Sequence, residues 1–403
     1  MTMMPPAAPD PKREPYYGPR SIPPGEQIYG RDEAIFELIN RLMANHVVLM
    51  HALSGAGKTS IIQAGLVPKL PKGFHVLPVA RVNNQPDLNE LAGGPQADVN
   101  PFCLSVLLSF EQAFPEEQRL PLNELAGLPL EGYLAQRHPS EDPETGEPRR
   151  LLLIFDQFEE LFTLLPLAHD KREDFFAWLM PVLYDVRCWS LFSMRDDFIG
   201  ALEPYLDYFP DRLSARFRLE FLRVEGALDA VQKPVEKFSA TFDEIAARLL
   251  VKNLSKTTVI EMDKTREVES RYIEPIQLQV VCLKLWRKRA SPGEISLEDV
   301  EKFGGVDTAL ADYYADVLKE IAGEDIRLER SLRDWIQRQL IIEDSFRVPS
   351  LQLQLARYGL DPSVIQRLIS AFLVRSEQRL GAVWYELAHD RLVKAVVEDN
   401  RRW

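Results

Sequence analysis

Residues 46–62 read HVVLMHALSGAGKTSII. A β-branched apolar run, a glycine-rich loop and an amphipathic run follow one another, which is the order of a strand, a phosphate-binding loop and a helix. The loop matches the pattern G-x-x-x-x-G-K-[ST] except that Ala52 stands at the first glycine. Alanine there restricts the backbone at a cost on the order of 1 kcal/mol, but it removes no ligand. The stretch therefore predicts a site for nucleotide phosphates.

In such a loop, successive backbone N–H groups bind phosphate oxygens with the helix dipole behind them. Lys58 is expected to reach the β- and γ-phosphates, and the Thr59 hydroxyl to coordinate Mg²⁺. A chance match in a solvent loop is the alternative, and the position between a strand and an amphipathic helix argues against it. The predicted phosphate-binding residues are Ser54, Gly55, Ala56, Gly57, Lys58, Thr59 and Ser60.

The apolar run LLLIFD at residues 151–156 ends in an acid. A carboxylate at the carboxyl end of a strand beside a phosphate-binding loop can hold Mg²⁺, so Asp156 is the predicted metal ligand. Glu159 and Glu160 follow at the start of the next helix, and one of the two is predicted to activate the attacking water. The alternative for these acids is a helix N-terminus that favours negative charge.

The run CWSLFSMR at residues 188–195 ends in Arg195, at the same predicted edge of the sheet. There its guanidinium would contact the γ-phosphate or stabilise transition-state charge. A salt bridge with Asp196 or Asp197 is the alternative. His389, in YELAHDRLVKAV, comes at a predicted helix start, where histidine is more often a packed or capping residue than a phosphate ligand.

The fold class follows from the order of these runs. HVLPVARV at 75–82 adds another nearly continuous apolar run, and such runs separated by helical stretches are typical of a parallel sheet with helices on both faces. After FRLEFL at 217–222 the apolar spacing is helical, and the chain closes with two short helices and two extended runs that can pair. The predicted parts are a proline-rich flexible arm at 1–27, a P-loop NTPase α/β domain at 28–222, a helical subdomain at 223–325 and a winged-helix-like domain at 326–403.

Totals over the 403 residues limit the function. A net charge of −13 argues against sequence-independent nucleic-acid binding, which requires lysine and arginine to neutralise phosphates. No apolar run approaches the roughly 20 residues of a membrane-spanning helix and no signal peptide opens the chain, so we expect a cytoplasmic protein outside the membrane. Cys103, Cys188 and Cys282 have no spacing typical of a metal site or a disulfide framework.

Five stretches in this order resemble the STAND group of P-loop ATPases, signalling switches related to NACHT and NB-ARC proteins. They are YGRDEAIFELI, SGAGKTSIIQAGLVPKL, LLIFDQFEELF, FSMRDDFIGAL and LAHDRLVKAV. The most similar branch is the bacterial one with a D-Q-F-E-E-L-F segment, and the resemblance covers residues from about 28 to 403. Asp156 matches its Mg²⁺-binding acid, Glu159 or Glu160 its catalytic acid and Arg195 its sensor arginine. The resemblance implies slow hydrolysis of ATP and a shape that depends on whether ATP or ADP is bound.

The resemblance also implies contacts to the nucleotide outside the phosphate loop. Gly30 and Arg31, in YGRDE, match the motif that lines the adenine and ribose side. Pro275, in EPIQLQVVCLKLW, is similar to the proline of the helical subdomain that packs near the adenine. His389 is similar to the winged-helix histidine that contacts the β-phosphate of bound ADP and keeps the molecule closed.

Members of the group usually carry a sensor array and an effector domain, which these 403 residues do not show. We therefore expect effector and sensor proteins or domains outside this chain, a homo-oligomer in the activated state and, by analogy alone, a role in bacterial antiviral defence or cell death.

Two other functions stay open. The first is an AAA+-like ATP-driven remodelling enzyme. The second is a DNA-binding regulator whose reading helix would be QRLISAF, with Arg367 toward phosphate. In that helix the surrounding leucines and isoleucine look like core positions, which argues against the second.

Overall fold

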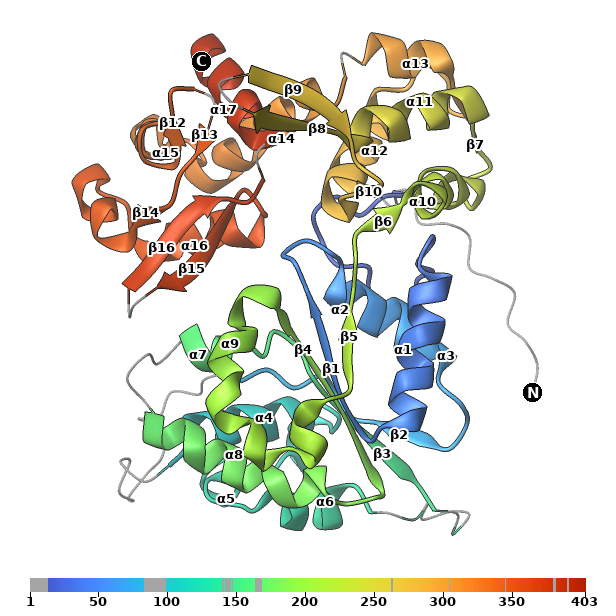
Figure 1. Cartoon of the computed structure of the whole chain (residues 1–403), viewed down its shortest axis with the longest axis vertical. Helices are drawn as coiled ribbons and strands as arrows, with labels where there is room; N and C mark the ends of the chain where they lie inside the picture. The colour runs from blue at the N-terminus through green and yellow to red at the C-terminus, as the bar shows by residue number, and fades with distance from the viewer. Residues whose placement is uncertain are drawn as a thin grey trace.

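The computed structural model describes residues 14–82, 99–139, 141, 146, 148–163, 169–261, 264–303, 305–344, 346–379, 382–389 and 391–403. An α/β part lies at one end of the molecule, and the remaining helices and hairpins lie at the other (Figure 1). None of the described helices combines the length and the apolar character of a membrane span.

A five-stranded parallel sheet forms the centre of the α/β part, as predicted. Its strand order is β2-β3-β4-β1-β5. The bounds are β1 Val47–Ala52, β2 Phe74–Val76, β3 Arg150–Phe155, β4 Cys188–Arg195 and β5 Arg216–Arg218. Because all five strands are parallel, their carboxyl ends meet at one edge, where ligands of α/β proteins bind.

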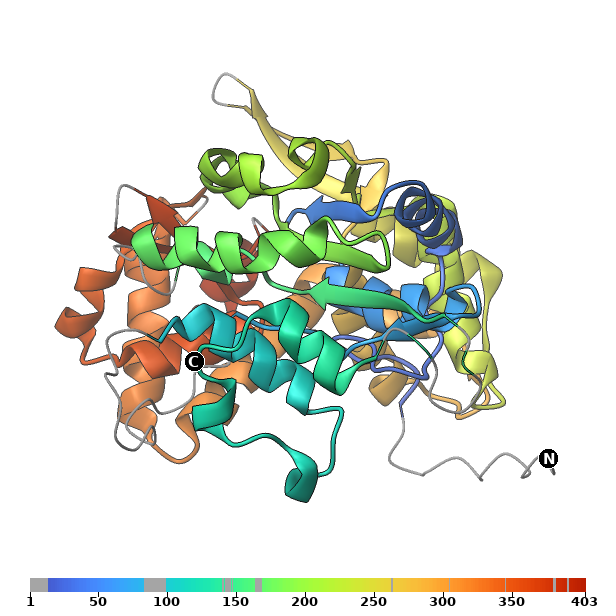
Figure 2. The ribbon, with the colours of Figure 1, turned by 90° about the horizontal axis from the view of Figure 1, so that it is seen from below.

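Helices cover both faces of this sheet because successive side chains of a strand point to opposite sides. On β3, Leu152 and Ile154 pack with α1 (Asp32–Ala44) and the π-helical segment η1 (Ile61–Leu66). Leu151, Leu153 and Phe155 pack on the other face, with α4 (Pro101–Glu111) and α8 (His169–Leu183). Seen from below, the blue and the green helices lie on opposite sides of the strands (Figure 2).

Shorter segments complete the α/β part. They are α2 Lys58–Ser60, α3 Val67–Lys69, η3 Glu116–Gln118, α5 Leu122–Leu125, α6 Leu130–Arg137, α7 Glu160–Thr163, η4 Asp196–Phe198, α9 Ile199–Leu202, η5 Glu203–Tyr208 and η6 Pro210–Leu213.

The part that follows β5 is mainly helical, as predicted. It contains β6 Leu222–Arg223, α10 Val224–Glu236, β7 Thr241–Phe242, α11 Glu244–Ser255, β8 Lys256–Glu261, β9 Lys264–Glu269, β10 Tyr272–Ile273, α12 Pro275–Lys288, β11 Glu294–Ile295, α13 Leu297–Lys302 and α14 Gly305–Ala322. The expectation that strands stop near residue 222 is wrong, because β8 and β9 pair as an antiparallel hairpin. A lone hairpin needs no continuous apolar run. The strands predicted from the sequence were all continuous apolar runs, so this hairpin was missed.

The C-terminal part has the two short helices and the paired runs that the sequence predicted. Its elements are α15 Ile326–Leu340, β12 Ile341–Ile342, β13 Phe346–Arg347, β14 Ser350–Leu351, η7 Gln352–Tyr358, α16 Pro362–Ser370, β15 Val374–Arg379, β16 Ala382–Leu387 and α17 Arg391–Arg402. β15 and β16 pair antiparallel, and β15 is an edge strand of the sheet β14-β16-β15. One hydrophobic core, with Leu318 of α14 and Trp335 of α15, spans the predicted boundary at residue 325.

The expectation of an unpacked arm is wrong for residues 14–27; residues 1–13 lie outside the described part. Tyr16 is 1% exposed and belongs to the core of the helical part. Its hydroxyl donates a hydrogen bond to the Val231 carbonyl of α10. An extended, proline-rich segment shows no apolar period even when it is packed, so no sequence pattern marks this contact.

Two glycines, Gly30 and Gly226, allow the segment before α1 to approach α10 of the helical part closely. Gly30 has a φ of +72°, and a Cβ on it would lie 2.0 Å from the Gly226 carbonyl oxygen of α10. We expect Gly30→Ala to lower the free energy of unfolding by about 3 kcal/mol, because it adds a backbone clash to the strain of a left-handed residue.

Gly73→Ala is the matched control in urea denaturation. Gly73 has a φ of +94°, and a Cβ there would meet nothing within 4 Å. It should therefore lose only about 1 kcal/mol. Equal losses in the two variants would show that the approach of Gly30 to Gly226 is not tight.

Candidate functional site

The loop after β1 has the shape of a phosphate-binding loop. Gly55 and Gly57 have φ angles of +79° and +92°, which glycine adopts without strain, and a Cβ on Gly57 would meet nothing within 4 Å. Ala52 is the last residue of β1, is fully buried and pairs with Arg195 of β4. Its backbone is extended, so the position has no need for glycine, and the departure from the pattern leaves the loop intact.

The carboxylate of Asp156 joins the loop to the edge of the sheet. Asp156 is 2% exposed. Its Oδ2 accepts a hydrogen bond of 2.7 Å from the Thr59 hydroxyl, and its Oδ1 one of 2.8 Å from the Ser193 hydroxyl. Arg81, which follows β2, donates from Nη2 to Oδ2 at 3.2 Å. Residues from the loop, β4 and the end of β2 thus converge on one buried carboxylate.

Lys58 and Glu159 face the same cavity and influence each other's charge. Burial lowers the pKa of the Lys58 ammonium, and the Glu159 carboxylate is the strongest opposing influence. Burial likewise raises the pKa of Glu159, against the effect of Lys58. The backbone N–H of Arg195 donates to Glu159 Oε2 at 3.3 Å, which orients the carboxylate.

Glu160 differs from Glu159 in its surroundings. Glu159 lines the cavity at the phosphate loop, whereas Glu160 does not. Burial raises the pKa of Glu160 to about 7, and the nearby Arg81 opposes that rise. The two acids, which the sequence could not distinguish, therefore occupy different environments.

Arg195 lines the cavity, and it also forms a salt bridge with Asp197, the alternative to a phosphate contact that the sequence left open. Its Nη2 pairs with the Asp197 carboxylate. Its Nη1 donates at 2.9 Å to the Ser376 carbonyl of β15, in the C-terminal part. Its Nε is buried and has no hydrogen-bond partner among the described residues. Asp196 instead contacts His51 and Arg218.

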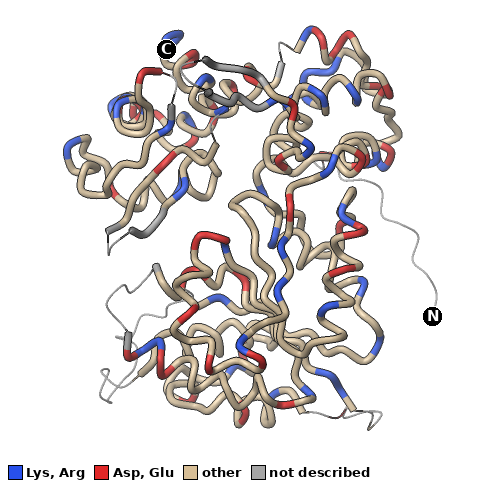
Figure 3. The backbone as a smooth tube through the Cα atoms, viewed as in Figure 1, with Lys and Arg blue, Asp and Glu red and all other residues tan. Residues whose placement is uncertain are grey.

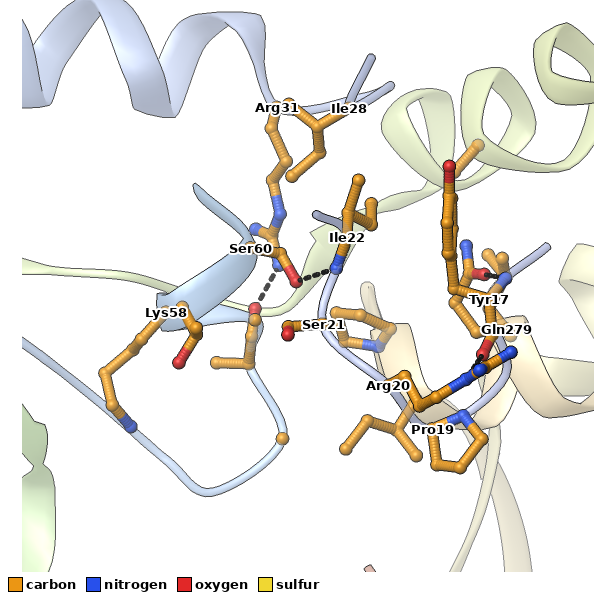
Figure 4. A pocket seen from close by; sticks show the side chains of 18 of the residues that line it. Tyr17, Pro19, Arg20, Ser21, Ile22, Ile28, Arg31, Lys58, Ser60 and Gln279 are labelled. Atoms are coloured by element: carbon orange, nitrogen blue, oxygen red, sulfur yellow. Dashed lines mark hydrogen bonds between the residues drawn. The ribbon is translucent and has the colours of Figure 1, made fainter. Parts of the chain in front are cut away.

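The cavity at the phosphate loop, called the main cavity below, lies where the α/β part, the helical part and the C-terminal part meet (Figure 4). The loop residues 54–60, together with Glu159 and Arg195, form a polar part of its lining. An apolar part of the lining consists of Ile28, Leu222, Ala230, Pro234, Pro275 and Leu278. A cavity lined both by apolar side chains and by a loop rich in backbone N–H groups suits a base joined to phosphates.

Arg31, in the YGRDE stretch, is hydrogen-bonded to the phosphate loop. Arg31 is 7% exposed, and it donates from Nη2 to the Ala56 carbonyl at 2.7 Å and from Nη1 to the Glu220 carbonyl at 2.6 Å. Burial lowers the pKa of Arg31 to about 10. Arg31 lines the main cavity, but Gly30 does not, because it packs against Gly226 of α10.

His389 lies beside the loop but contacts a carboxylate. Its Nε2 is 2.6 Å from Glu274 Oε1, and its Nδ1 accepts the backbone N–H of Arg391 at 3.0 Å. A smaller cavity, lined by Ser54, Gly55, Glu274 and His389 among others, adjoins the main one. The histidine therefore ties the start of α17 to the residue before Pro275.

Sequence reasoning missed two contributors to this site. Arg81 is the penultimate residue of the run at 75–82, a charge close to the end of an apolar run as Asp156 and Arg195 are, but the run predicts only a strand. The arm residues 15 and 17–22 also line the cavity, and no motif marks them.

The residues present fit a nucleotide with Mg²⁺. The Thr59 hydroxyl and the Asp156 carboxylate lie together, and both offer the oxygen ligands that Mg²⁺ prefers. Among the described residues there is no cluster of three or more His, Cys, Asp or Glu able to hold a metal unaided.

The fold and this loop define a P-loop NTPase. The model of the family "Novel STAND NTPase 1" matches residues 23–395, so the chain belongs to that family and the STAND resemblance is confirmed. No curated protein gives a significant match.

Several solved structures are similar over most of their length. The Walker-type ATPase of Pyrococcus abyssi has 14% identity and a TM-score of 0.47, covering 94% of this chain and 98% of that chain. The ORC2 protein of Aeropyrum pernix, in ADPNP and ADP complexes, has 15% identity and a TM-score of 0.44, covering 94% and 96%. The RuvB Holliday junction branch migration motor of Thermotoga maritima has 10% identity and a TM-score of 0.38, covering 91% and 94%.

The pKa of Glu160 predicts how stability depends on pH. A folded-state value of about 7, above the ordinary 4.5, means that the folded protein loses stability as pH rises from 4.5 through 7. Glu160→Gln removes this loss, so it should be more stable than wild type by about 2–3 kcal/mol at pH 8 and no more stable at pH 4. Urea denaturation at both pH values measures the difference. A gap between the two proteins that does not change with pH contradicts the assignment.

Proposed function

We propose that this chain is a nucleotide-controlled switch that binds ATP or ADP with Mg²⁺, hydrolyses ATP slowly and changes the contacts between its parts with the nucleotide. The observation that carries the proposal is the make-up of the main cavity. The phosphate loop, helices α10 and α12, and Phe372 of the C-terminal part all line it. A ligand bound there touches all of them at once.

Binding is assigned to the loop residues 54–60. Their N–H groups and the Lys58 ammonium hold the phosphates, while Pro275 and its apolar neighbours contact the base. Mg²⁺, held by Thr59 and Asp156, neutralises phosphate charge. The buried hydrogen bonds of Asp156 keep its carboxylate in place for that task.

Hydrolysis is assigned to Glu159 rather than Glu160. Glu159 lines the cavity, and the Arg195 N–H orients its carboxylate toward one position. A carboxylate with a raised pKa near the γ-phosphate can take a proton from the attacking water. Arg195 supplies positive charge at the same end of the cavity.

Two contacts are assigned to the switch, because a nucleotide biases two states only through contacts that differ between them. The His389–Glu274 contact joins the C-terminal part to the helical part. The Arg195–Ser376 contact joins the C-terminal part to the edge of the sheet. A γ-phosphate that attracts Arg195 would release Ser376, and a β-phosphate of ADP that attracts His389 would hold the molecule closed.

The DNA-binding alternative loses support from the surroundings of α16. Ile365 and Leu368 are fully buried, as the sequence suggested. Arg367 donates to the Ile321 and Glu320 carbonyls at the end of α14. Figure 3 shows basic and acidic residues mixed through all parts of the chain. We therefore propose no nucleic-acid partner.

By analogy with the group, we place the switch in the cytoplasm and in antiviral defence or cell death. On that view sensor and effector functions lie outside these residues, and activation produces a homo-oligomer.

We expect Glu159→Gln to bind ATP but to hydrolyse it at least about 100-fold more slowly, because loss of a general base typically removes that factor. Glu160→Gln is the matched control and should keep turnover within a few-fold of wild type. Lys58→Ala should lose binding altogether. Fluorescence titration with a labelled ATP and release of phosphate measure these effects. Wild-type turnover in Glu159→Gln would reject the assignment.

For the His389 contact we expect His389→Ala to release bound ADP about tenfold faster, the effect of losing a hydrogen bond to a charged group. Glu274→Gln should act in the same direction, and the double variant should add little, because the two residues share one contact. Stopped-flow release of a fluorescent ADP provides the rates. Fully additive effects, or unchanged release, would mean that the contact does not hold the closed form.

A further inference from the structure

Residues 15–22 form part of the wall of the main cavity. Pro15, Tyr17, Pro19, Arg20 and Ile22 all line it, and Figure 4 shows this segment passing between the loop that carries Lys58 and the helix that carries Gln279. The family match begins at residue 23. Residues 15–22 therefore lie before the first matched residue.

Both ends of the segment are anchored, each to a different part of the molecule. On the helical side, the Tyr16 hydroxyl donates to the Val231 carbonyl, and the Tyr17 N–H donates to Gln279 Oε1 at 2.9 Å. On the loop side, the Ile22 N–H donates to the Ser60 hydroxyl oxygen at 3.1 Å. The segment thus connects α12 to the first turn after the phosphate loop.

The side chains that the segment presents are mostly apolar. Figure 4 shows Tyr17 and Pro19 on the side of the cavity away from Lys58, with Ile22 and Ile28 between, and Pro275 also lines the cavity. Apolar and aromatic surfaces suit a purine base and a ribose more than phosphates. Arg20 is exposed, and its Nε donates to the Tyr17 carbonyl at 3.4 Å, within the segment itself.

We propose that residues 15–22 are part of the nucleotide site: they close its base end and retain a bound purine nucleoside diphosphate. The inference rests on the proposed nucleotide binding. Retention follows because the segment is held to both the loop and α12, so a ligand lying between these leaves only after one anchor opens. Its effect is on dissociation, which is where most differences in affinity arise.

Trypsin tests the wall without a mutation, because it cleaves after Arg20. The full chain is digested with and without saturating ADP, and cleavage of the Arg20–Ser21 bond is followed by mass spectrometry. ADP should slow this cleavage at least about fivefold, since the bond borders the occupied cavity and must leave its anchors to enter a protease.

Tyr16→Phe tests retention. Tyr16 does not line the cavity, so the variant removes only the anchoring hydroxyl. Loss of one buried hydrogen bond should speed dissociation of a fluorescent ADP about fivefold. Tyr133→Phe is the matched control. Tyr133 lies on α6, away from the site, and its buried hydroxyl donates a hydrogen bond to Glu111. It should leave dissociation unchanged.

The outcomes separate this inference from the function on which it rests. If wild-type protein binds no ADP in a fluorescence titration, the proposed function fails. If ADP binds but cleavage after Arg20 is not slowed, residues 15–22 are not part of the site. If ADP binds and Tyr16→Phe releases it no faster than Tyr133→Phe, the segment does not retain the nucleotide. Either of the last two results overturns the inference.

Discussion

The buried carboxylate of Asp156 is the interaction on which the site depends. Strands β1, β3 and β4 and the segment after β2 end together at one edge of a parallel sheet, and each contributes a group there. Asp156 receives hydrogen bonds from Thr59, Ser193 and Arg81. Burying a carboxylate to 2% exposure is costly unless it is paired and hydrogen-bonded in this way. Those bonds fix the phosphate loop relative to the sheet.

Around this edge, two side-chain contacts join the other parts of the chain to one another and to the sheet. Arg195 carries a buried Nε without an acceptor among the described residues, while its Nη1 reaches Ser376. His389 reaches Glu274, beside the smaller cavity that Ser54 and Gly55 line. Each of these two side chains lies near the position proposed for a phosphate. The proposed switch needs contacts that differ between its two states, and these two lie beside one loop.

Local patterns predicted the sheet and its edge, whereas contacts between distant residues stayed hidden. The loop glycines are marked by the phosphate-loop pattern, and Asp156 and Arg195 by apolar runs that end in a charge. Tyr16 is not marked, because its partner lies 215 residues away and an extended segment has no period. The hairpin β8–β9 escaped because it lacks the continuous apolarity of a covered sheet. For His389 the sequence suggested a place beside the loop but could not name Glu274.

The central claim is that one nucleotide lies with its phosphates at residues 54–60 and its base among the arm, α10 and α12. Photolabelling with 8-azido-ADP, followed by peptide mapping, tests it most directly, because the azide reacts with whatever surrounds the base. The account predicts label in peptides that contain residues 15–22 or 275–279, and its loss when excess ADP competes. Label that ADP displaces but that maps only to peptides away from this cavity would contradict the account.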